Sequence, residues 1–399
     1  MSGKQRYYLQ SPGLINALGC GQSDIRIRLL AGDTSGMTLE TGWLATGPAR
    51  LGCVIGELPQ VPDTMAHLRC RNNRLLLAAL AQIEAEVEAA MTRFGRSRIG
   101  VVLGTSTSGM AEGEAAVMEL RATGKFPAGF HYAQQEIGTT APFLAKYLGL
   151  LGPAFTVSTA CTSSGKAFAS ARNLLRLGVC DAVLVGGVDS LCRLTVNGFS
   201  ALESTSTELC NPMSRNRCGI NIGEGAALFL MSREPGPVAL LGVGESSDAH
   251  HISAPDPSGH GAEKAMRAAL ADAGLEAEAV DYLNLHATAT LKNDEMESLA
   301  VSRVFPAGVP CSGTKPLTGH TLGAAGATEL AFCWLALSGE NTAGKLPPHV
   351  WDGESDPTLA PLSLLTPDSR FGRSAGRVCM SNSFAFGGNN ISLLIGDSQ

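Results

Sequence analysis

Residues 158–165 read Ser-Thr-Ala-Cys-Thr-Ser-Ser-Gly, between an apolar run that includes Phe155 and Val157 and an alanine-rich run from Lys166 to Leu175. Such a pattern predicts a buried strand that turns sharply into a helix. The thiol of Cys161 would then lie at the helix N-terminus, where unpaired N–H groups and the helix dipole favour an anion. We therefore expect Cys161 to ionise easily and to act as a nucleophile.

Two histidines in the second half of the chain each follow a strand-like run and precede a helical one. His286 opens the stretch His-Ala-Thr-Ala-Thr, and His320 is the second residue of Gly319–Gly323. The hydroxyls of Thr288 and Thr290 share one side at strand spacing and can hydrogen-bond a ligand's amide groups. The glycines beside His320 let the backbone approach a ligand closely. One thiol and two imidazoles at strand ends predict acyl-thioester chemistry.

The bulk composition predicts a soluble globular protein. A chain of 399 residues with 44% hydrophobic content can bury roughly three quarters of its surface. The net charge of −6 argues against a broad nucleic-acid surface. The 11 cysteines show no C-x-x-C spacing, residues 1–13 lack the layout of a secretory signal, and no run is long enough to span a membrane. We expect reduced thiols and a cytoplasmic location.

No metal or other cofactor is expected. His250, His251 and His260 lie close together in the sequence, but no third ligand follows at a suitable spacing. The cysteines other than Cys161 lack its setting of small hydroxyl residues and are interpreted as structural. Motifs for a serine nucleophile elbow and for a phosphate-binding loop are also missing from the sequence.

Short apolar runs alternate with helical ones, which predicts an α/β protein of parallel βαβ units with helices on both sheet faces. In the first half we expect fully buried strands at 99–103, 154–157, 182–185 and 226–231, and helices at 74–91, 111–123, 137–148 and 166–177. In the second half we expect strands at 238–243, 282–285, 309–312, 378–381 and 391–395, and helices at 262–273, 294–304 and 323–337.

A strand, a small-residue corner and an alanine-rich helix occur at both 154–177 and 309–337, which indicates an internal repeat. We divide the chain into similar halves, 1–236 and 237–399, at the sequence Pro-Gly-Pro. Because the thiol lies in the first half and both histidines in the second, the halves should meet at a cleft. The small-residue loop 383–390 is either a simple turn or a source of N–H groups for an oxyanion.

Together these motifs resemble the β-ketoacyl-acyl carrier protein synthases of the I/II type, and the likeness covers almost the whole chain. The likeness rests on Thr159–Ser164, on His286–Thr290 as the counterpart of H-G-T-x-T, on Lys315 with Gly319–Gly326, and on Phe386–Asn389. It implies the thiolase fold, a five-layered αβαβα sandwich of two similar halves that dimerises near the nucleophile strand. It also implies a decarboxylative Claisen condensation between an acyl-enzyme and malonyl-carrier protein.

The resemblance assigns roles to the reacting groups. The Cys161 thiolate would take the acyl group from an acyl carrier protein, in a hole formed by the N–H groups of Cys161 and Phe386. His286 and His320 would each donate a hydrogen bond from Nε2 to the enolate formed as carbon dioxide leaves. The ring of Phe386 would act as a gate.

It also assigns supporting roles. Lys315, paired with Glu329, would hold His320 in place, and Thr288 and Thr290 would grip the pantetheine arm of the carrier. Other residues assigned to substrate binding are Thr107, Phe199 and Ser253. The reaction requires no cofactor beyond the carrier's own phosphopantetheine.

Several positions depart from the family pattern. Ala287 and Ala385 stand where glycine is usual, Asn389 replaces a threonine, and Thr107 stands where a bulky apolar residue often lines the acyl pocket. A methyl group at position 385 should stiffen the gating loop. The pattern is most similar to the ketosynthases of bacterial aryl-polyene pathways, which implies a polyunsaturated acyl chain and a silent chain-length partner.

Two alternatives stay open. A thiolase would use a second cysteine as its base, but Cys379 lies seven positions before Phe386 in a strand-like run. A non-catalytic chain-length factor would typically lack the nucleophile that Cys161 provides. The acyl carrier protein is the expected partner, and Arg69, Arg71 and Arg74 either bind its acidic surface or form an ordinary solvated helix start. The dimer can be formed by two copies or with a chain-length-factor-like paralogue.

Overall fold

One short strand near the N-terminus joins two sheet regions. In the computed structural model, which describes residues 5–398, β1 (Tyr7–Leu9) pairs antiparallel with β10 (Gly225–Ser232) and with β11 (Val238–Ser247). On the β10 side lie β8 (Ala182–Asp189), β6 (Ile99–Gly104) and β7 (Ala154–Val157). On the β11 side lie β16 (Asn389–Asp397), β15 (Val378–Phe384), β12 (Tyr282–Asn284), β13 (Pro310–Ser312) and β14 (Ser363–Leu364).

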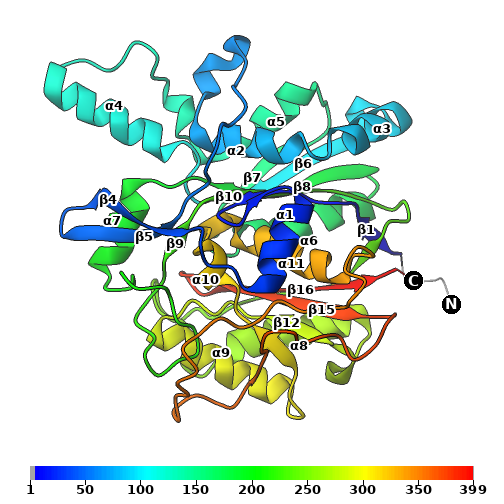
Figure 1. Cartoon of the computed structure of the whole chain (residues 1–399). Helices are drawn as coiled ribbons and strands as arrows, with labels where there is room; N and C mark the ends of the chain where they lie inside the picture. Colours follow the sequence, from blue (N-terminus) through cyan, green and yellow to red (C-terminus); the bar gives the residue numbers. More distant parts are fainter. Residues whose placement is uncertain (1–4, 399) are drawn as a thin grey trace.

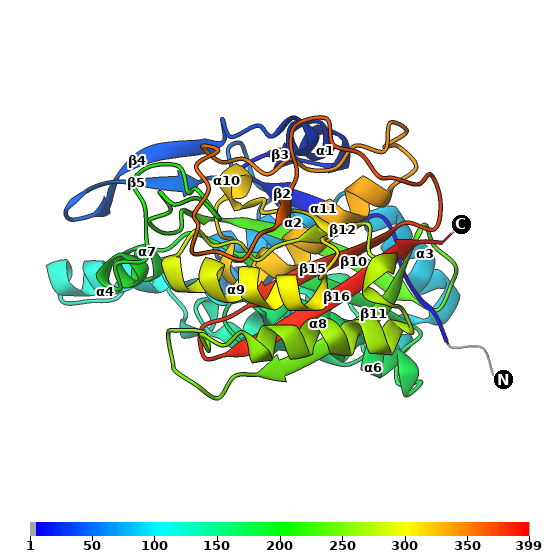
Figure 2. The same ribbon diagram turned by 90° about the horizontal axis from the view of Figure 1, so that it is seen from below.

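Three helical layers enclose and separate the two sheet regions (Figure 1). The middle layer is formed by α6 (Ser163–Arg176) and α11 (Ala325–Leu337). The outer layer on the β6 side contains α2 (Arg71–Leu80), α3 (Glu84–Phe94) and α5 (Thr140–Leu148). On the other side, α8 (His260–Ala273) and α9 (Leu291–Val304) lie next to each other against β11, β15 and β16 (Figure 2). This arrangement confirms the predicted five-layered α/β sandwich.

The remaining elements decorate this sandwich. They are the helices α1 (Gln22–Ala31), α4 (Met110–Thr123), α7 (Arg193–Ala201) and α10 (Lys315–Thr318), the hairpin β2 (Gly13–Asn16) with β3 (Gly19–Cys20), and the small sheet of β4 (Met37–Leu44), β5 (Gly47–Gly52) and β9 (Ile222–Gly223). None of the helices within 5–398 is long and apolar enough to cross a membrane.

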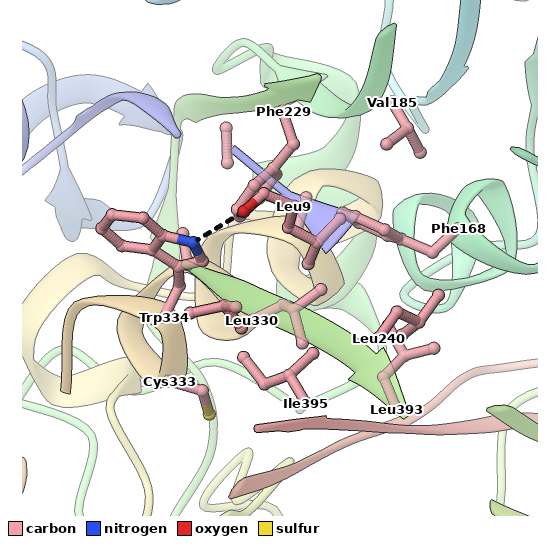
Figure 3. Packing of buried hydrophobic residues seen from close by; sticks show 14 of the residues in the cluster. Leu9, Phe168, Val185, Phe229, Leu240, Leu330, Cys333, Trp334, Leu393 and Ile395 are labelled. Atoms are coloured by element: carbon pink, nitrogen blue, oxygen red, sulfur yellow. Dashed lines mark hydrogen bonds between the residues drawn. The ribbon is translucent and has the colours of Figure 1, made fainter. Parts of the chain in front are cut away.

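The middle layer is buried because both of its faces meet a sheet. Every residue of α11 is buried, in agreement with a sequence that is apolar all round except near Glu329. Trp334 packs among Leu9, Phe229 and Leu330, and its indole N–H donates to the carbonyl of Leu9 at 3.3 Å (Figure 3). A buried indole needs such a partner, so this contact fixes α11 against β1, where the two sheet regions join.

Three expectations about the elements are wrong. The expected helix 74–91 is two helices, because the backbone at Ile83 is not helical, with φ −124° and ψ 16°, and beside this break the side chain of Gln82 binds both backbone groups of Leu14. The strand at 154–157 is not fully buried, because β7 is the edge strand and Phe155 is 39% exposed. The sheet is mixed: β6 runs parallel to β7 and β8, whereas β8 and β10 are antiparallel. The domain boundary at residue 236 stays a prediction.

Candidate active site

The predicted turn from strand to helix at Cys161 is present. β7 ends at Val157 and α6 begins at Ser163. Between them Ala160 has φ +53°, a left-handed conformation that a side chain rarely adopts. The Ser163 hydroxyl stabilises this conformation, since it donates to the carbonyl of Ala160 at 2.5 Å and accepts the N–H of Thr159 at 2.9 Å. The turn therefore places Cys161 beneath the first turn of α6, where its side chain is buried.

Three hydrogen-bonding groups surround the sulfur of Cys161. Nε2 of His320 lies 3.0 Å away, and the backbone N–H groups of Phe386 and of Cys161 itself also reach the sulfur. Burial nevertheless raises the pKa of the Cys161 thiol to about 11, against the opposing charge of Lys315 and these N–H groups. The expectation that the helix N-terminus makes this thiol easy to ionise is therefore wrong for the closed site, because desolvation outweighs the helix dipole.

His320 is held in one tautomer. Its Nδ1 accepts the backbone N–H of Leu322 at 3.2 Å, so the proton of the neutral ring resides on Nε2. Its backbone pairs with the strand-like segment before β10, where His320 N–H donates to Asn221 and Gly223 N–H donates to His320. The glycine at position 319 is needed for this backbone packing and not for the approach of a ligand, because a Cβ there would lie 2.7 Å from the nitrogen of Gly223.

His286 follows β12 and faces His320, with the two ring centres 5.4 Å apart. Its Nδ1 lies 3.4 Å from Nζ of Lys315, a donor, which again assigns the ring proton to Nε2. The backbone N–H groups of His286 and Ala287 each donate to the carboxylate of Glu297 at 2.7 Å. These two bonds hold Ala287 at φ +41°, the position where the family pattern has glycine.

Lys315 is buried and contacts a different histidine from the one expected. Its Nζ lies 2.5 Å from Glu329 and also donates to the carbonyl of His286. The pairing with Glu329 is present, but the support of His320 by Lys315 is wrong, because the ammonium group reaches His286. Burial and the positive charge of Lys315 lower the pKa of both His286 and His320 well below the ordinary value. Both rings are therefore neutral donors at neutral pH.

Ligand atoms of Cys161, His286 and His320 all lie within 4.8 Å of one another, a spacing that can suit a metal ion. The surroundings of the two rings oppose this use. A histidine that binds a metal through Nε2 usually donates its Nδ1–H to an acceptor. Here both Nδ1 atoms face donors, the N–H of Leu322 and the ammonium of Lys315. The cluster is arranged to donate protons in hydrogen bonds rather than to coordinate a cation.

A cavity of about 470 Å³ opens onto the sulfur and both imidazoles. Thr288 and Thr290 line it, with their hydroxyl oxygens 2.9 Å apart, as the strand spacing predicts. The predicted residues Phe199, on α7, and Ser253 also line it. The remaining predicted substrate contact is Thr107, and the structure places it elsewhere: its hydroxyl donates to the buried carboxylate of Asp189 at 2.7 Å, outside the cavity wall.

The loop after β15 brings Phe386 over the nucleophile. Its ring packs against Phe199 at a centre distance of 5.5 Å, while its N–H points to Cys161. Gly387 N–H donates to the carbonyl of Ile252, which ties the loop to the segment after β11. Cys379 is buried within β15 beside Cys333 and is not part of the cavity wall, so the placement required of a thiolase base is not found there.

Sequence reasoning missed two buried carboxylates, Glu297 and Asp189. Their positions in the sequence could have drawn attention to them. Glu297 lies one helical turn after Asn293, and Asp189 lies at the end of an apolar strand. The arginines considered for carrier binding are engaged within the chain. Arg71 pairs with buried Glu224 at 2.5 Å, and Arg74 donates to the carbonyls of Leu58 and Pro59. Arg69 pairs with the exposed Asp63 and stays 42% exposed itself, so carrier binding by this cluster stays a prediction.

Comparison with known proteins adds independent observations. Residues 54–235 match the family described as the beta-ketoacyl synthase N-terminal domain, and residues 238–350 match the C-terminal domain. Nodulation protein E of Rhizobium meliloti is 35% identical, with 85% of this chain and 86% of that protein covered. The 3-oxoacyl-[acyl-carrier-protein] synthase 2 of Rhizobium meliloti strain 1021 is 30% identical, with 98% of each covered. The ketosynthase ApeO of Xenorhabdus doucetiae, solved in complex with its chain length factor ApeC, has a TM-score of 0.93 and 47% identity over 99% of this chain and 98% of that one.

Proposed function

This chain belongs to the β-ketoacyl synthase family and is an elongating condensing enzyme, and we propose which of its residues carry out the condensation and on which substrate. The observation that carries the assignment is the 3.0 Å approach of His320 Nε2 to the Cys161 sulfur, with His286 facing the same cavity. A chain-length factor has no need of this arrangement.

In the first half-reaction the Cys161 sulfur attacks the thioester carbonyl of an acyl-carrier protein. The new S–C bond forms as the carrier's pantetheine thiol leaves with the proton of Cys161, so no net charge is left on the enzyme. The N–H groups of Phe386 and Cys161, which already point to the sulfur, stabilise the oxyanion of the tetrahedral intermediate. Because burial raises the pKa of Cys161, the resting form at neutral pH is the thiol.

In the second half-reaction malonyl-carrier protein occupies the cavity, with its pantetheine arm held by Thr288 and Thr290. His286 and His320 both donate Nε2–H to the thioester oxygen, which carries the enolate charge once the C–C bond to carbon dioxide breaks. The enolate carbon attacks the acyl-Cys161 carbonyl, and the sulfur leaves as a thiolate, which takes a proton from solvent to restore the thiol. Because the two rings are neutral, their role is hydrogen-bond donation without proton transfer, and we propose that no metal or other cofactor takes part.

We propose an extended polyunsaturated acyl chain of the aryl-polyene type as the substrate, and a chain-length-factor-like paralogue as the partner. The 47% identity to ApeO, which was solved with its chain length factor, supports the partner. The half-exposed edge strand β7, directly before the nucleophile, supplies a face for it. We place the enzyme in the cytoplasm, since the cysteines in the described residues are all unpaired thiols.

The test is acylation of the enzyme by an acyl-carrier protein, followed by mass spectrometry of the peptide that contains Cys161. We expect an acyl adduct on Cys161, release of carbon dioxide and a β-ketoacyl product when malonyl-carrier is added. His286→Ala should keep the adduct and lose decarboxylation. An unmodified Cys161 peptide, under conditions in which the carrier delivers its chain to another ketosynthase, would show that this chain is a binding subunit.

A further inference from the structure

The last residue of β8, Asp189, is fully buried between two turns that support the reacting residues. Its Oδ1 accepts hydrogen bonds from the hydroxyl of Thr105, the N–H of Ser106, and both the N–H and hydroxyl of Thr107, at 2.7–2.9 Å. Its Oδ2 accepts the N–H of Ala324 at 2.9 Å. Five donors converge on a single carboxylate, more than is needed to stabilise one strand end.

One of the two turns supports the nucleophile. The segment after β6, from Thr105 to Thr107, is held by Asp189 Oδ1, and within it the Ser106 hydroxyl donates to the carbonyl of Ala160 at 3.2 Å. Ala160 is the left-handed residue directly before Cys161. The strands β6, β7 and β8 are parallel, so their carboxyl ends meet at one edge of the sheet. Asp189 therefore reaches the backbone of the nucleophile through one intermediate side chain.

The other turn supports His320. Ala324, which donates to Asp189, ends the short 3-10 helix Leu322–Ala324, and the N–H of Leu322 holds Nδ1 of His320. Leu322 has φ +50°, so this turn is strained. A Cβ at Gly323 would lie 2.7 Å from the nitrogen of Ser106 and 2.8 Å from Oδ2 of Asp189, so the two turns are in direct backbone contact.

We propose that Asp189 is a positioning residue that sets the distance and orientation between the Cys161 sulfur and the His320 ring by holding these two turns together. The inference rests on the roles proposed above for Cys161 and His320. Burial raises the pKa of Asp189 to about 6, so at pH 7.5 the carboxylate is ionised and all its lone pairs can accept. A neutral amide of the same shape cannot satisfy both turns.

The variant Asp189→Asn should keep the contacts with one turn and lose the contact with the other. The amide oxygen can keep the four donors of the Thr105–Thr107 segment, while the amide NH₂ is then directed at the N–H of Ala324. We expect kcat for decarboxylation of malonyl-carrier protein to fall by up to about a hundredfold, the typical cost of misplacing a catalytic group by an ångström, with KM little changed. The pH at which Cys161 reacts with iodoacetamide should move upward, because the Nε2–H donor to the sulfur is lost.

Asp397→Asn is the matched control, because Asp397 is another carboxylate at a strand end, the last residue of β16, and its buried side chain binds Arg377 away from the cavity. It should lower the thermal midpoint without changing kcat or the alkylation profile. Ala324→Pro removes the Ala324 N–H, which donates both to Asp189 and to the carbonyl of Thr321, and should reproduce the kinetic effect of Asp189→Asn. Equal kinetic losses in Asp189→Asn and Asp397→Asn, or losses in stability alone, would show that Asp189 is only structural.

Decarboxylation by His320→Ala, measured in the same assay, separates the positioning role of Asp189 from the proposed role of His320. If His320→Ala decarboxylates as fast as the unaltered enzyme, the role of His320 fails. If His320→Ala is inactive while Asp189→Asn and Ala324→Pro keep full activity, only the positioning role of Asp189 fails.

Discussion

At the scale of single residues, the chemistry depends on what faces Nδ1 of each imidazole. The backbone N–H of Leu322 and the ammonium of Lys315 both donate to Nδ1 atoms, so both rings offer Nε2–H to the cavity. The sequence motifs predicted the catalytic thiol and the two histidines, because each of them lies in a recognisable local pattern. It could not supply the contact of Lys315 with His286 or the raised pKa of Cys161, because both depend on packing between segments far apart in the sequence.

Lys315→Met should lose decarboxylation and destabilise the protein. Removing one partner of a buried ion pair costs about 3–5 kcal/mol, and it leaves Glu329, whose pKa burial already raises to about 7, without its cation. A carboxyl with a raised folded-state pKa stabilises the fold at low pH and loses this contribution as pH rises. The penalty measured by urea unfolding should therefore grow from pH 6 to pH 9.

Lys345→Met is the control for this variant, because Lys345 pairs with an exposed aspartate at the surface. It should change neither activity nor the unfolding midpoint measurably. A Lys315→Met protein whose stability relative to the unaltered enzyme does not depend on pH would contradict the buried pairing with Glu329.

At the scale of elements, the strand–turn–helix units could be predicted, because a run of β-branched residues followed by small ones is a local signal. The break between α2 and α3 could not be predicted, because Gln82 at the break binds Leu14, 68 positions away, a contact that no local pattern reveals. The edge position of β7 likewise depends on which strands pair. The burial of all residues of α11 follows from its place between two sheets, which its sequence, apolar nearly all round, already indicated.

His349 binds the segment 338–377 to the rest of the fold through its ring. Its titration gives a second pH-dependent prediction. Its Nδ1 accepts the N–H of Gly313 and its Nε2 donates to the carbonyl of Pro212, both at 3.0 Å. Burial lowers the pKa of His349 to about 4, so the unfolded chain binds the extra proton first as pH falls below the ordinary value of about 6.5. The contribution of His349 should shrink by about 2 kcal/mol between pH 7.5 and pH 5.

His349→Asn should therefore unfold more easily at pH 7.5 and show a shallower loss of stability toward pH 5 than the unaltered protein. Urea midpoints at the two pH values measure this difference. The exposed His260 provides the control His260→Asn, which should leave the slope unchanged. Parallel slopes for His349→Asn and the unaltered protein would rule out a neutral buried imidazole at this position.

The gating loop carries a third prediction. Ala385 is buried, and its N–H donates to the carbonyl of Asn389 at 2.7 Å, which closes the turn that presents Phe386. Ala385→Gly should destabilise the protein by about 0.4–1 kcal/mol through the greater freedom of the unfolded chain. It should also speed alkylation of Cys161, because Phe386 swings away more often. An alkylation rate equal to that of the unaltered protein would show that the methyl group does not restrain the loop.

At the scale of the whole molecule, β1 and α11 join two sheet regions and so fix the thiol of one against the imidazoles of the other. The edge strand β7, with Phe155 half exposed, is the face that we assign to the partner. Phe155→Asp should prevent association with a co-expressed chain-length-factor-like paralogue while the chain remains folded. Light scattering after size exclusion measures the mass, and an unchanged complex would place the partner on another face.

The claim on which the mechanism depends is that His286 and His320 are neutral and carry their protons on Nε2. Nitrogen-15 NMR of histidine-labelled enzyme, assigned with His286→Gln and His320→Gln, tests it most directly. We predict that both rings show a protonated Nε2 and an unprotonated Nδ1, with no titration between pH 5 and pH 8. A proton on Nδ1 of either ring, or a ring that becomes charged near pH 6.5, would contradict the account.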